Sequence, residues 1–160
     1  NNRAEAFWMK KGILGDTVPL ELNAKELVHR NNKNSELTVY GYTPMMVSVQ
    51  CVQKTMDHCN HACVQYVLKD RYQKEFRGVC SCEFCYNTIY NTLPTSLLKE
   101  KEKAEKLGVK AYRLSFTTET QQETEKIVRA FVDVYLRGQK PDGQMQTEET
   151  TKGHFQRGVE

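Results

Sequence analysis

Hydrophobic and polar residues alternate along several short stretches of the chain, which is the pattern of β-strands with one buried face. The strands predicted in this way span residues 17–22 (TVPLEL), 36–42 (ELTVYGY), 45–49 (MMVSV), 86–90 (YNTIY) and 109–116 (VKAYRLSF). Val64–Leu68 and Phe76–Val79 flank a charged segment, and this arrangement predicts a β-hairpin.

Helical periodicity is clearest in residues 120–137, where apolar side chains return every three or four positions. Thr120 is the predicted N-cap, Glu123 completes a capping box with it, and Gly138 ends the helix. The other two predicted helices span 24–30, with Asn23 as N-cap, and 94–107, with Thr95 or Ser96 as N-cap and Gly108 at the end.

Strands and helices alternate at both ends of the chain, which is typical of parallel βαβ units in an α/β fold. Between them, the segment 45–90 is rich in predicted strands and contains every cysteine; residues 51–63 within it lack periodicity and are predicted to be a loop. We therefore expect residues 1–137 to form an α/β structure with an insertion at 45–90. Residues 138–160 are expected to be a linker and a short closing segment.

Composition narrows the functional classes only slightly. Charged residues make up 27% of the chain and the net charge is +3, so the mildly basic surface permits an anionic partner without indicating one. No apolar run approaches the roughly 20 residues of a membrane span, and the first residues lack the apolar core of a secretory signal. We expect a cytosolic protein with no membrane partner. Because the sequence does not begin with methionine, we also expect it to be a piece of a longer polypeptide.

Six cysteines lie between positions 51 and 85, and none lies elsewhere. In the cytosol, clustered cysteines with C-x3-C and C-x2-C spacings more often hold a metal than form disulfides. A zinc site on Cys59, Cys63, Cys82 and Cys85 is close to zinc-ribbon spacing. An iron–sulfur cluster on four cysteines is a second interpretation, and a scaffold of disulfides is a third.

Two histidines, His58 and His61, stand within the cysteine cluster. They can ligate zinc, although histidines in such loops are more often solvated. Either can also activate a neighbouring thiolate as a nucleophile. Several thiols this close together favour shared ligation over one lone nucleophile.

Four stretches follow one another in the order of a known family. They are PLELNAKEL (19–27), VYGYTPMMVSVQC (39–51), LKDRYQKEF with CEFCYNTIYNTLP (within 68–94) and TTKGHFQRGVE (150–160), and RLSF (113–116) adds a fifth. Together they resemble the peptidase family U-32, the collagenase-like proteases. LKDR, CxxCYNxIYN and GHFxRG are the specific parts of this resemblance.

The resemblance implies both a fold and a chemistry. The family fold is a (β/α)8 barrel of the TIM type, so the chain would be the C-terminal part of such a barrel with a β-rich, cysteine-containing insertion. Family members hold a 4Fe–4S cluster on four cysteines. The better-understood members are oxygen-independent hydroxylases of tRNA, ribosomal RNA or the ubiquinone precursor, and the RNA-acting branch is linked to prephenate. The partners implied are RNA and the remainder of the chain's own barrel.

Carried over residue by residue, the resemblance implies that the cluster is held by Cys51, Cys59, Cys82 and Cys85. Cys51 follows MMVSVQ, Cys82 and Cys85 stand in CxxCYN, and Cys59 lies between Cys51 and LKDR. The two additional cysteines are substitutes, Cys63 for Cys59 and Cys80 for Cys82.

Other candidate site residues come from the ends of predicted strands, where barrel enzymes work, and from the closing GHFxRG segment. They are Glu21, Asn23, Arg113, Ser115 and His154. Arg113 and Ser115 point to the same side of their strand, and Arg113 can bind a carboxylate or phosphate with two hydrogen bonds. Alternatively, Arg113 forms a surface ion pair with Glu119 or Glu123.

The leading hypothesis is therefore part of a cytosolic bacterial U-32 enzyme that carries a 4Fe–4S cluster and hydroxylates an RNA base. The alternatives are a collagenase-like peptidase with a structural metal and a non-catalytic binding module stabilised by zinc. Without the rest of a barrel, the βα units would expose an apolar edge and an apolar inner face. We therefore also expect the chain to self-associate.

Overall fold

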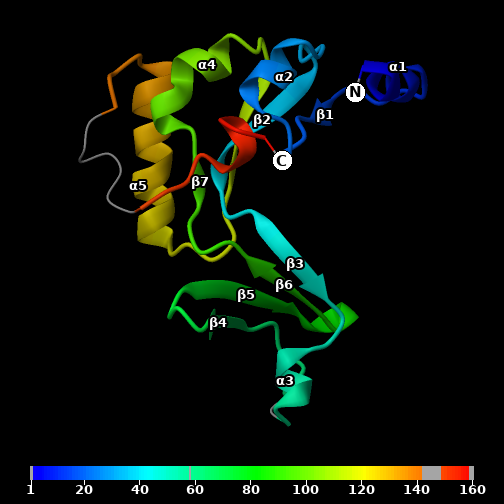
Figure 1. Cartoon of the computed structure of the whole chain (residues 1–160), viewed down its shortest axis with the longest axis vertical. Coiled ribbons are helices and arrows are strands. Elements are labelled where there is room, and N and C mark those ends of the chain that lie inside the picture. Colours follow the sequence, from blue (N-terminus) through cyan, green and yellow to red (C-terminus); the bar gives the residue numbers. More distant parts are fainter. Residues whose placement is uncertain (1, 58, 142–148, 159–160) are drawn as a thin grey trace. The chain divides into compact units, whose positions relative to one another are not determined.

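A computed structural model of the chain describes residues 2–57, 59–141 and 149–158. The structure is mixed α/β and divides into two compact units, residues 1–41 with 95–160 and residues 42–94 (Figure 1). Each unit contains one four-stranded sheet, and neither sheet closes into a barrel. The second unit contains the whole cysteine-rich segment.

The first sheet is centred on β2 (Ser35–Gly41), whose β-branched and aromatic residues favour extended structure. β8 (Ala111–Ser115) pairs in parallel with β2 along one edge. β1 (Asp16–Thr17) pairs in parallel with the start of β2, and β7 (Thr95–Ser96) pairs antiparallel with its end. The expected parallel arrangement therefore holds for three strands, and β7 departs from it.

The strand predicted over 17–22 is much shorter than expected. β1 ends at Thr17, although the amide of Val18 still donates to the carbonyl of Glu36 at 2.9 Å. Pro19 follows and has no amide hydrogen to extend the ladder, so the chain turns toward the next helix.

The helix predicted over 94–107 is wrong in its first turn. Only a 3₁₀ turn (Leu98–Glu100) and α4 (Lys101–Glu105) are helical. The residues before them are extended because the amide of Ser96 donates to Thr151 and that of Leu97 donates to Val39, both at 2.8 Å. These bonds to distant parts of the chain outweigh the local helical pattern, and Thr95 and Ser96 form a strand in place of an N-cap.

The two other predicted helices are present with their predicted caps. Asn23 caps α2 (Ala24–Val28), and Thr120 caps α5 (Gln121–Phe131), each in a complete capping box. α5 continues as a π-helical turn through Val132–Leu136. A further helix, α1 (Asn2–Lys10), was not predicted.

The core of the first unit lies between one face of its sheet and the helices. Phe155, from a 3₁₀ turn (Gly153–Phe155) in the closing segment, is part of this core. Its other buried members are Val18, Leu27, Leu37, Val39, Tyr40, Leu97, Leu98, Ala104, Leu107, Ala130, Phe131 and Val134. The closing segment is thus anchored to the first unit by a buried aromatic side chain.

The other face of the first sheet is polar, contrary to the apolar inner face that we expected. Glu36 lies on it between two partners: Thr17 donates to its carboxylate at 2.7 Å, and Arg113 forms an ion pair with it at 2.6 Å. The self-association expected from the sequence also rested on an open sheet edge, and it stays a prediction.

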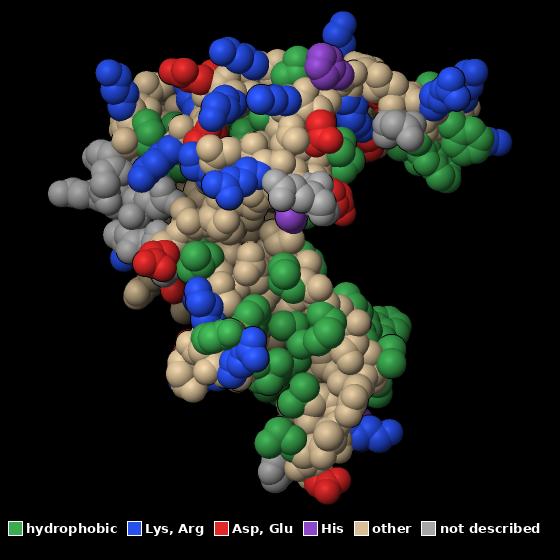
Figure 2. Space-filling model, viewed as in Figure 1, with side chains coloured by type: hydrophobic (Ala, Val, Ile, Leu, Met, Phe, Trp, Pro, Cys, Tyr) green, Lys and Arg blue, Asp and Glu red, His purple; other side chains and the backbone are tan. Residues whose placement is uncertain are grey.

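The second sheet is antiparallel, with strand order β3-β6-β5-β4. β4 (Gln65–Lys69) and β5 (Glu75–Ser81) form the predicted hairpin, and β6 (Tyr86–Tyr90) matches its predicted bounds. β3 (Pro44–Ser48) is the outer strand next to β6. In Figure 2, hydrophobic side chains are frequent on the visible face of this unit, whereas Lys and Arg side chains are frequent on the first.

The segment predicted to be a loop, 51–63, contains one short helix, α3 (Val52–Thr55). It begins shortly after the end of β3, and four residues are too few to show helical periodicity in the sequence. No helix in the described parts of the chain has the length and apolar character needed to cross a membrane.

Candidate metal centre

The ends of the strands position the cysteines of the second unit. Cys51 is the N-cap residue of α3. Cys80 lies near the end of β5, and Cys82 opens the 3₁₀ turn (Cys82–Phe84) that joins β5 to β6. Cys85 follows that turn. The other two cysteines lie in the segment between α3 and β4.

Three side chains form a group that can hold a metal ion. The ligand atoms of Cys59, His61 and Cys82 all lie within 4.8 Å of one another. Tetrahedral ligands bound to one zinc ion at about 2.0–2.3 Å are about 3.3–3.8 Å apart, so side-chain movements of up to about 1 Å would bring these atoms to one ion. Cys82 is buried, whereas Cys59 and His61 are exposed and give the group an open side.

The turn after β5 holds Cys85 beside this group. The amide of Cys85 donates to the carbonyl of Cys82 at 3.3 Å, and its thiol lies 3.7 Å from the same oxygen. Cys85 has φ of 52° and ψ of 41°, a left-handed conformation that is uncommon for a residue with a side chain. Strained residues of this kind concentrate at functional sites, and here the strain closes the C-x2-C turn.

A second pair of thiols lies next to the group. The Sγ atoms of Cys51 and Cys80 are 3.6 Å apart, and both side chains are buried. Burial, together with the neighbouring Cys51, raises the pKa of Cys80 to about 12. The backbone N–H groups of Lys54 and Gln53 act in the opposite direction and lower the pKa of Cys51.

Cys82 connects the two sets of thiols. Burial raises its pKa, and the neighbouring thiols of Cys59 and Cys85 raise it further, while Cys80 acts on it in the opposite sense. A bound cation would relieve the repulsion among these thiolates, which is the electrostatic condition for a metal site. Thiolates with an imidazole are soft donors that suit zinc or an iron–sulfur cluster.

The sequence-predicted cysteine ligands are therefore found in two places. Cys59 and Cys82 form the group with His61, and Cys85 lies beside this group. Cys51 pairs instead with Cys80. Cys63 is exposed and is not part of the group. All six cysteines are free thiols, so the disulfide scaffold is absent from this structure. His58 lies outside the described residues.

The other candidate residues all lie in the first unit. Asn23 uses its side-chain oxygen to cap α2, and Glu21 is exposed in the turn before it. Arg113 is paired with Glu36, where the sequence suggested Glu119 or Glu123. The parallel register of β2 and β8 brings these two strands together, which sequence spacing alone does not reveal.

Ser115 and His154, the remaining candidates, both make contacts within the fold of the first unit. Ser115 ends β8 opposite Gly41, where a β-carbon would lie 2.6 Å from the carbonyl oxygen of Ser115. The close approach of the two strands therefore requires glycine at position 41. The Nδ1 atom of His154 lies 3.0 Å from the carbonyl oxygen of Gly158, so the imidazole closes the final turn of the described chain.

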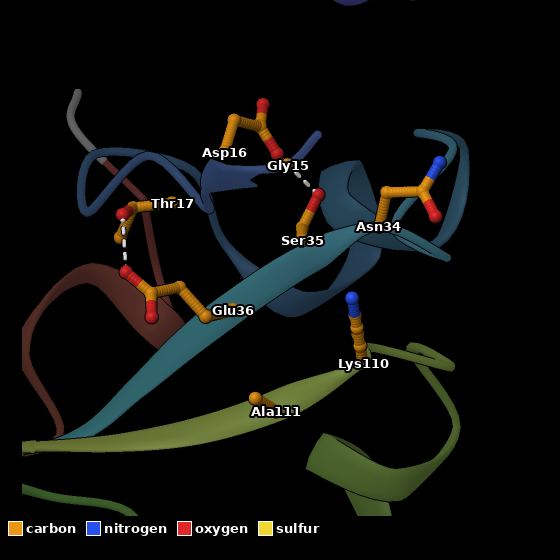
Figure 3. A pocket seen from close by; sticks show the side chains of 8 residues that line it. All are labelled: Gly15, Asp16, Thr17, Asn34, Ser35, Glu36, Lys110 and Ala111. Carbon is orange, nitrogen blue, oxygen red and sulfur yellow. Dashed lines mark hydrogen bonds between the residues drawn. The ribbon is translucent and has the colours of Figure 1, made fainter. Parts of the chain in front are cut away.

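A polar cavity of about 400 Å³ lies at the amino-terminal ends of β1, β2 and β8 (Figure 3). Ser35 donates to Asp16 at 2.5 Å across it, and Lys110 points toward β2. Active sites of barrel enzymes lie at the opposite ends of the strands. None of the candidates named from the sequence is among the described residues that line this cavity.

Two polar residues of the second unit, one buried and one partly buried, were not singled out from the sequence. Asn87 and Tyr66 lie on the sheet face that bears Cys80, and each has a buried polar atom without a hydrogen-bond partner among the described residues. Sequence reasoning included the YN dipeptide at 86–87 only as part of the CxxCYN motif. Only the strand register shows that its asparagine points to the interior.

Comparisons with protein-family models, with curated proteins and with solved structures found no match to this chain.

Proposed function

We propose that the chain is part of a U-32 family enzyme whose second unit holds a 4Fe–4S cluster, and that the enzyme hydroxylates an RNA base without oxygen. The observation that carries the proposal is the convergence of Cys59 and Cys82 with His61, with Cys85 beside them. Cys51, 3.6 Å from Cys80, completes the set of ligands that the family resemblance implies. When bound, such a cluster supplies redox chemistry that side chains lack.

The role of this chain's own residues is to hold and shield the centre. The turn from Cys82 to Cys85 fixes two thiols, and the burial of Cys80 and Cys82 provides an apolar wall. Burial and hydrogen bonds to the ligand sulfurs tune such centres. The mildly basic net charge of +3 is compatible with an RNA partner.

One observation favours a second candidate, a zinc-stabilised binding module. His61 is a member of the ligand group, and mixed cysteine and histidine sites are typical of structural zinc. In this case the metal contributes folding free energy to the second unit and no chemistry.

Anaerobic purification followed by metal and sulfide analysis separates the two candidates. A brown protein with iron and sulfide in equal amounts supports the cluster. A colourless protein with one zinc ion per chain, obtained from medium that contains both metals, contradicts it and supports the binding module.

The enzymatic part is tested in a strain that lacks the full-length parent protein. We expect its RNA to miss one hydroxylated base by mass spectrometry, and the purified protein to leave gelatin and casein intact. Unaltered RNA together with proteolysis that persists without the cluster contradicts the proposal and favours the peptidase.

A further inference from the structure

An open cavity of about 240 Å³ lies between one face of the second sheet and the helix α3, and the methionines that line it, Met46 and Met56, are partly exposed to solvent. Its apolar lining comes from Met46 on β3, Ile89 on β6 and the side chains of Val52 and Met56 in and after α3. Engineered apolar cavities of about 150 Å³ bind benzene, so this cavity has room for one substituted ring. Methionine side chains adapt to the shape of a ligand.

A buried acceptor without a partner lies in the wall of the cavity. Asn87 is 1% exposed, and its Nδ2 atom donates to the carbonyl oxygen of Gln50 at 2.9 Å. That bond fixes the orientation of the amide, so Oδ1 is the free end. Oδ1 is buried and has no hydrogen-bond partner among the described residues. An unsatisfied buried acceptor costs about 1–3 kcal/mol, which a donor in the cavity would offset.

A hydroxyl group lines the same cavity. The Oη atom of Tyr66 is buried and also lacks a partner within the described structure. The ring is held over Gly78 on the neighbouring strand, where a β-carbon would lie 2.3 Å from the ring atoms. The absence of a side chain at Gly78 therefore lets Tyr66 lie across the sheet face.

We propose that this cavity binds a small, single-ring aromatic compound that carries an O–H or N–H donor. The ring would occupy the apolar space between Met46 and Met56, and its donor would satisfy Oδ1 of Asn87. Tyr66 would supply a second hydrogen bond. The inference concerns the second unit alone and does not depend on which metal the cysteines hold.

The position of the cavity gives the ligand a route to affect the metal centre. Gln50 and Val52, on either side of Cys51, both line it. Asn87 pairs across the sheet with Cys80, and Tyr66 packs against the buried cysteines. An occupied cavity would therefore restrict the backbone that carries Cys51.

The test is a titration of the whole chain, purified with its metal bound, with phenol, observed through its methionine methyl resonances by NMR. We expect saturable shifts at Met46 and Met56 at millimolar phenol, and little change at Met45, which is similarly exposed but does not line the cavity. Toluene, which has the same ring without a donor, is expected to bind about three- to tenfold more weakly, as the loss of one hydrogen bond predicts.

Two variants locate the site. Val52→Trp should fill the cavity and abolish the phenol shifts, whereas Val49→Trp, at an 87% exposed position, should leave them intact. Tyr66→Phe should weaken phenol binding several-fold, and Tyr72→Phe, at an exposed tyrosine, should not.

Three results would overturn the proposal. Absence of shifts at both methionines would show that the cavity holds water only. Equal affinity for phenol and toluene would show an apolar pocket in which Asn87 plays no part. Phenol shifts that persist in a folded Val52→Trp chain would place the ligand elsewhere. Because the comparison of phenol with toluene uses the unaltered chain, it decides the question even if a variant fails to fold.

Discussion

Asn87 donates from Nδ2 to the carbonyl oxygen of Gln50 at 2.9 Å, and this bond fixes the residue before Cys51 against the second sheet. Asn87 lies on β6, between β3 and β5, directly opposite Cys80. The amide of Asn87 therefore ties the backbone before Cys51 to the strand that pairs with Cys80. We expect stability and metal binding in the second unit to be coupled through it.

We expect Asn87→Ala to lower the free energy of unfolding by about 1–3 kcal/mol, because the partly buried hydrogen bond from Asn87 to the carbonyl of Gln50 is lost. Urea denaturation of the metal-free chain measures the change. Thr88→Ala, on the opposite face of the same strand, is the control and should cost less. Equal losses in the two variants would contradict a special role for the asparagine.

The ligand set is tested by single substitutions. We expect the metal to be lost from the serine variants of Cys51, Cys59, Cys82 and Cys85, and to be kept by Cys63→Ser and Cys80→Ser. His61→Ala distinguishes the two kinds of centre: it should keep a cluster held by four thiolates and should lose zinc held by the Cys59–His61–Cys82 group. Metal content per chain is the measurement. If Cys80→Ser loses metal while Cys51→Ser keeps it, Cys80 is the ligand of that pair.

Gly78 and Tyr66 form a packing pair that can be tested by a double-mutant cycle. A β-carbon at position 78 would lie 2.3 Å from the tyrosine ring, so Gly78→Ala should destabilise the chain by about 1–3 kcal/mol. Most of this loss should vanish when the substitution is made in a Tyr66→Ala chain, because the ring is then absent. Losses that simply add would show that the glycine is required for another reason.

The carboxyl group of Glu100 makes the stability of the first unit depend on pH. Although its burial acts in the other direction, Lys103 at 2.6 Å and Lys152 hold the pKa of this carboxyl below its usual range. A lowered folded pKa adds stability above the unfolded pKa of about 4.3, and this stability is lost as the pH falls through the folded pKa.

We therefore expect Glu100→Gln to destabilise the chain by about 1–3 kcal/mol at neutral pH. The difference from the unaltered chain should disappear below the folded pKa of Glu100. Thermal unfolding measured at several pH values checks this. Glu105→Gln, at a more exposed carboxylate, is the control and should show a smaller effect. A difference that is independent of pH would contradict the ion-pair explanation.

The sequence predicts the elements whose signals are local. The N-cap at Asn23, the capping box at Thr120, the strand β6 and the β4–β5 hairpin all depend on neighbouring residues, and all are present. The start of the predicted helix at 94–107 failed because its amides bond to Val39 and Thr151. These partners are distant in the sequence, so the pattern of residues 94–107 does not reveal them.

The candidate metal site shows the same difference between features that depend on local sequence and features that depend on tertiary contacts. Cysteine spacing was sufficient to place a candidate metal centre in the second unit, but it did not select among the six thiols. The participation of His61 depends on a left-handed backbone at that residue, with φ of 57°. The contact between Cys51 and Cys80 depends on the register of β5 and on the path of the chain after β3. Both are tertiary properties.

The pairing of Gly41 with Thr95 has a consequence for the modular design of the molecule. These residues are the points at which the chain leaves and rejoins the first unit, and opposed residues of an antiparallel ladder lie only about 5 Å apart. A two-residue turn such as Asn-Gly can close that gap. The distance between its ends therefore does not by itself require residues 42–94 to complete the ladder of the first unit.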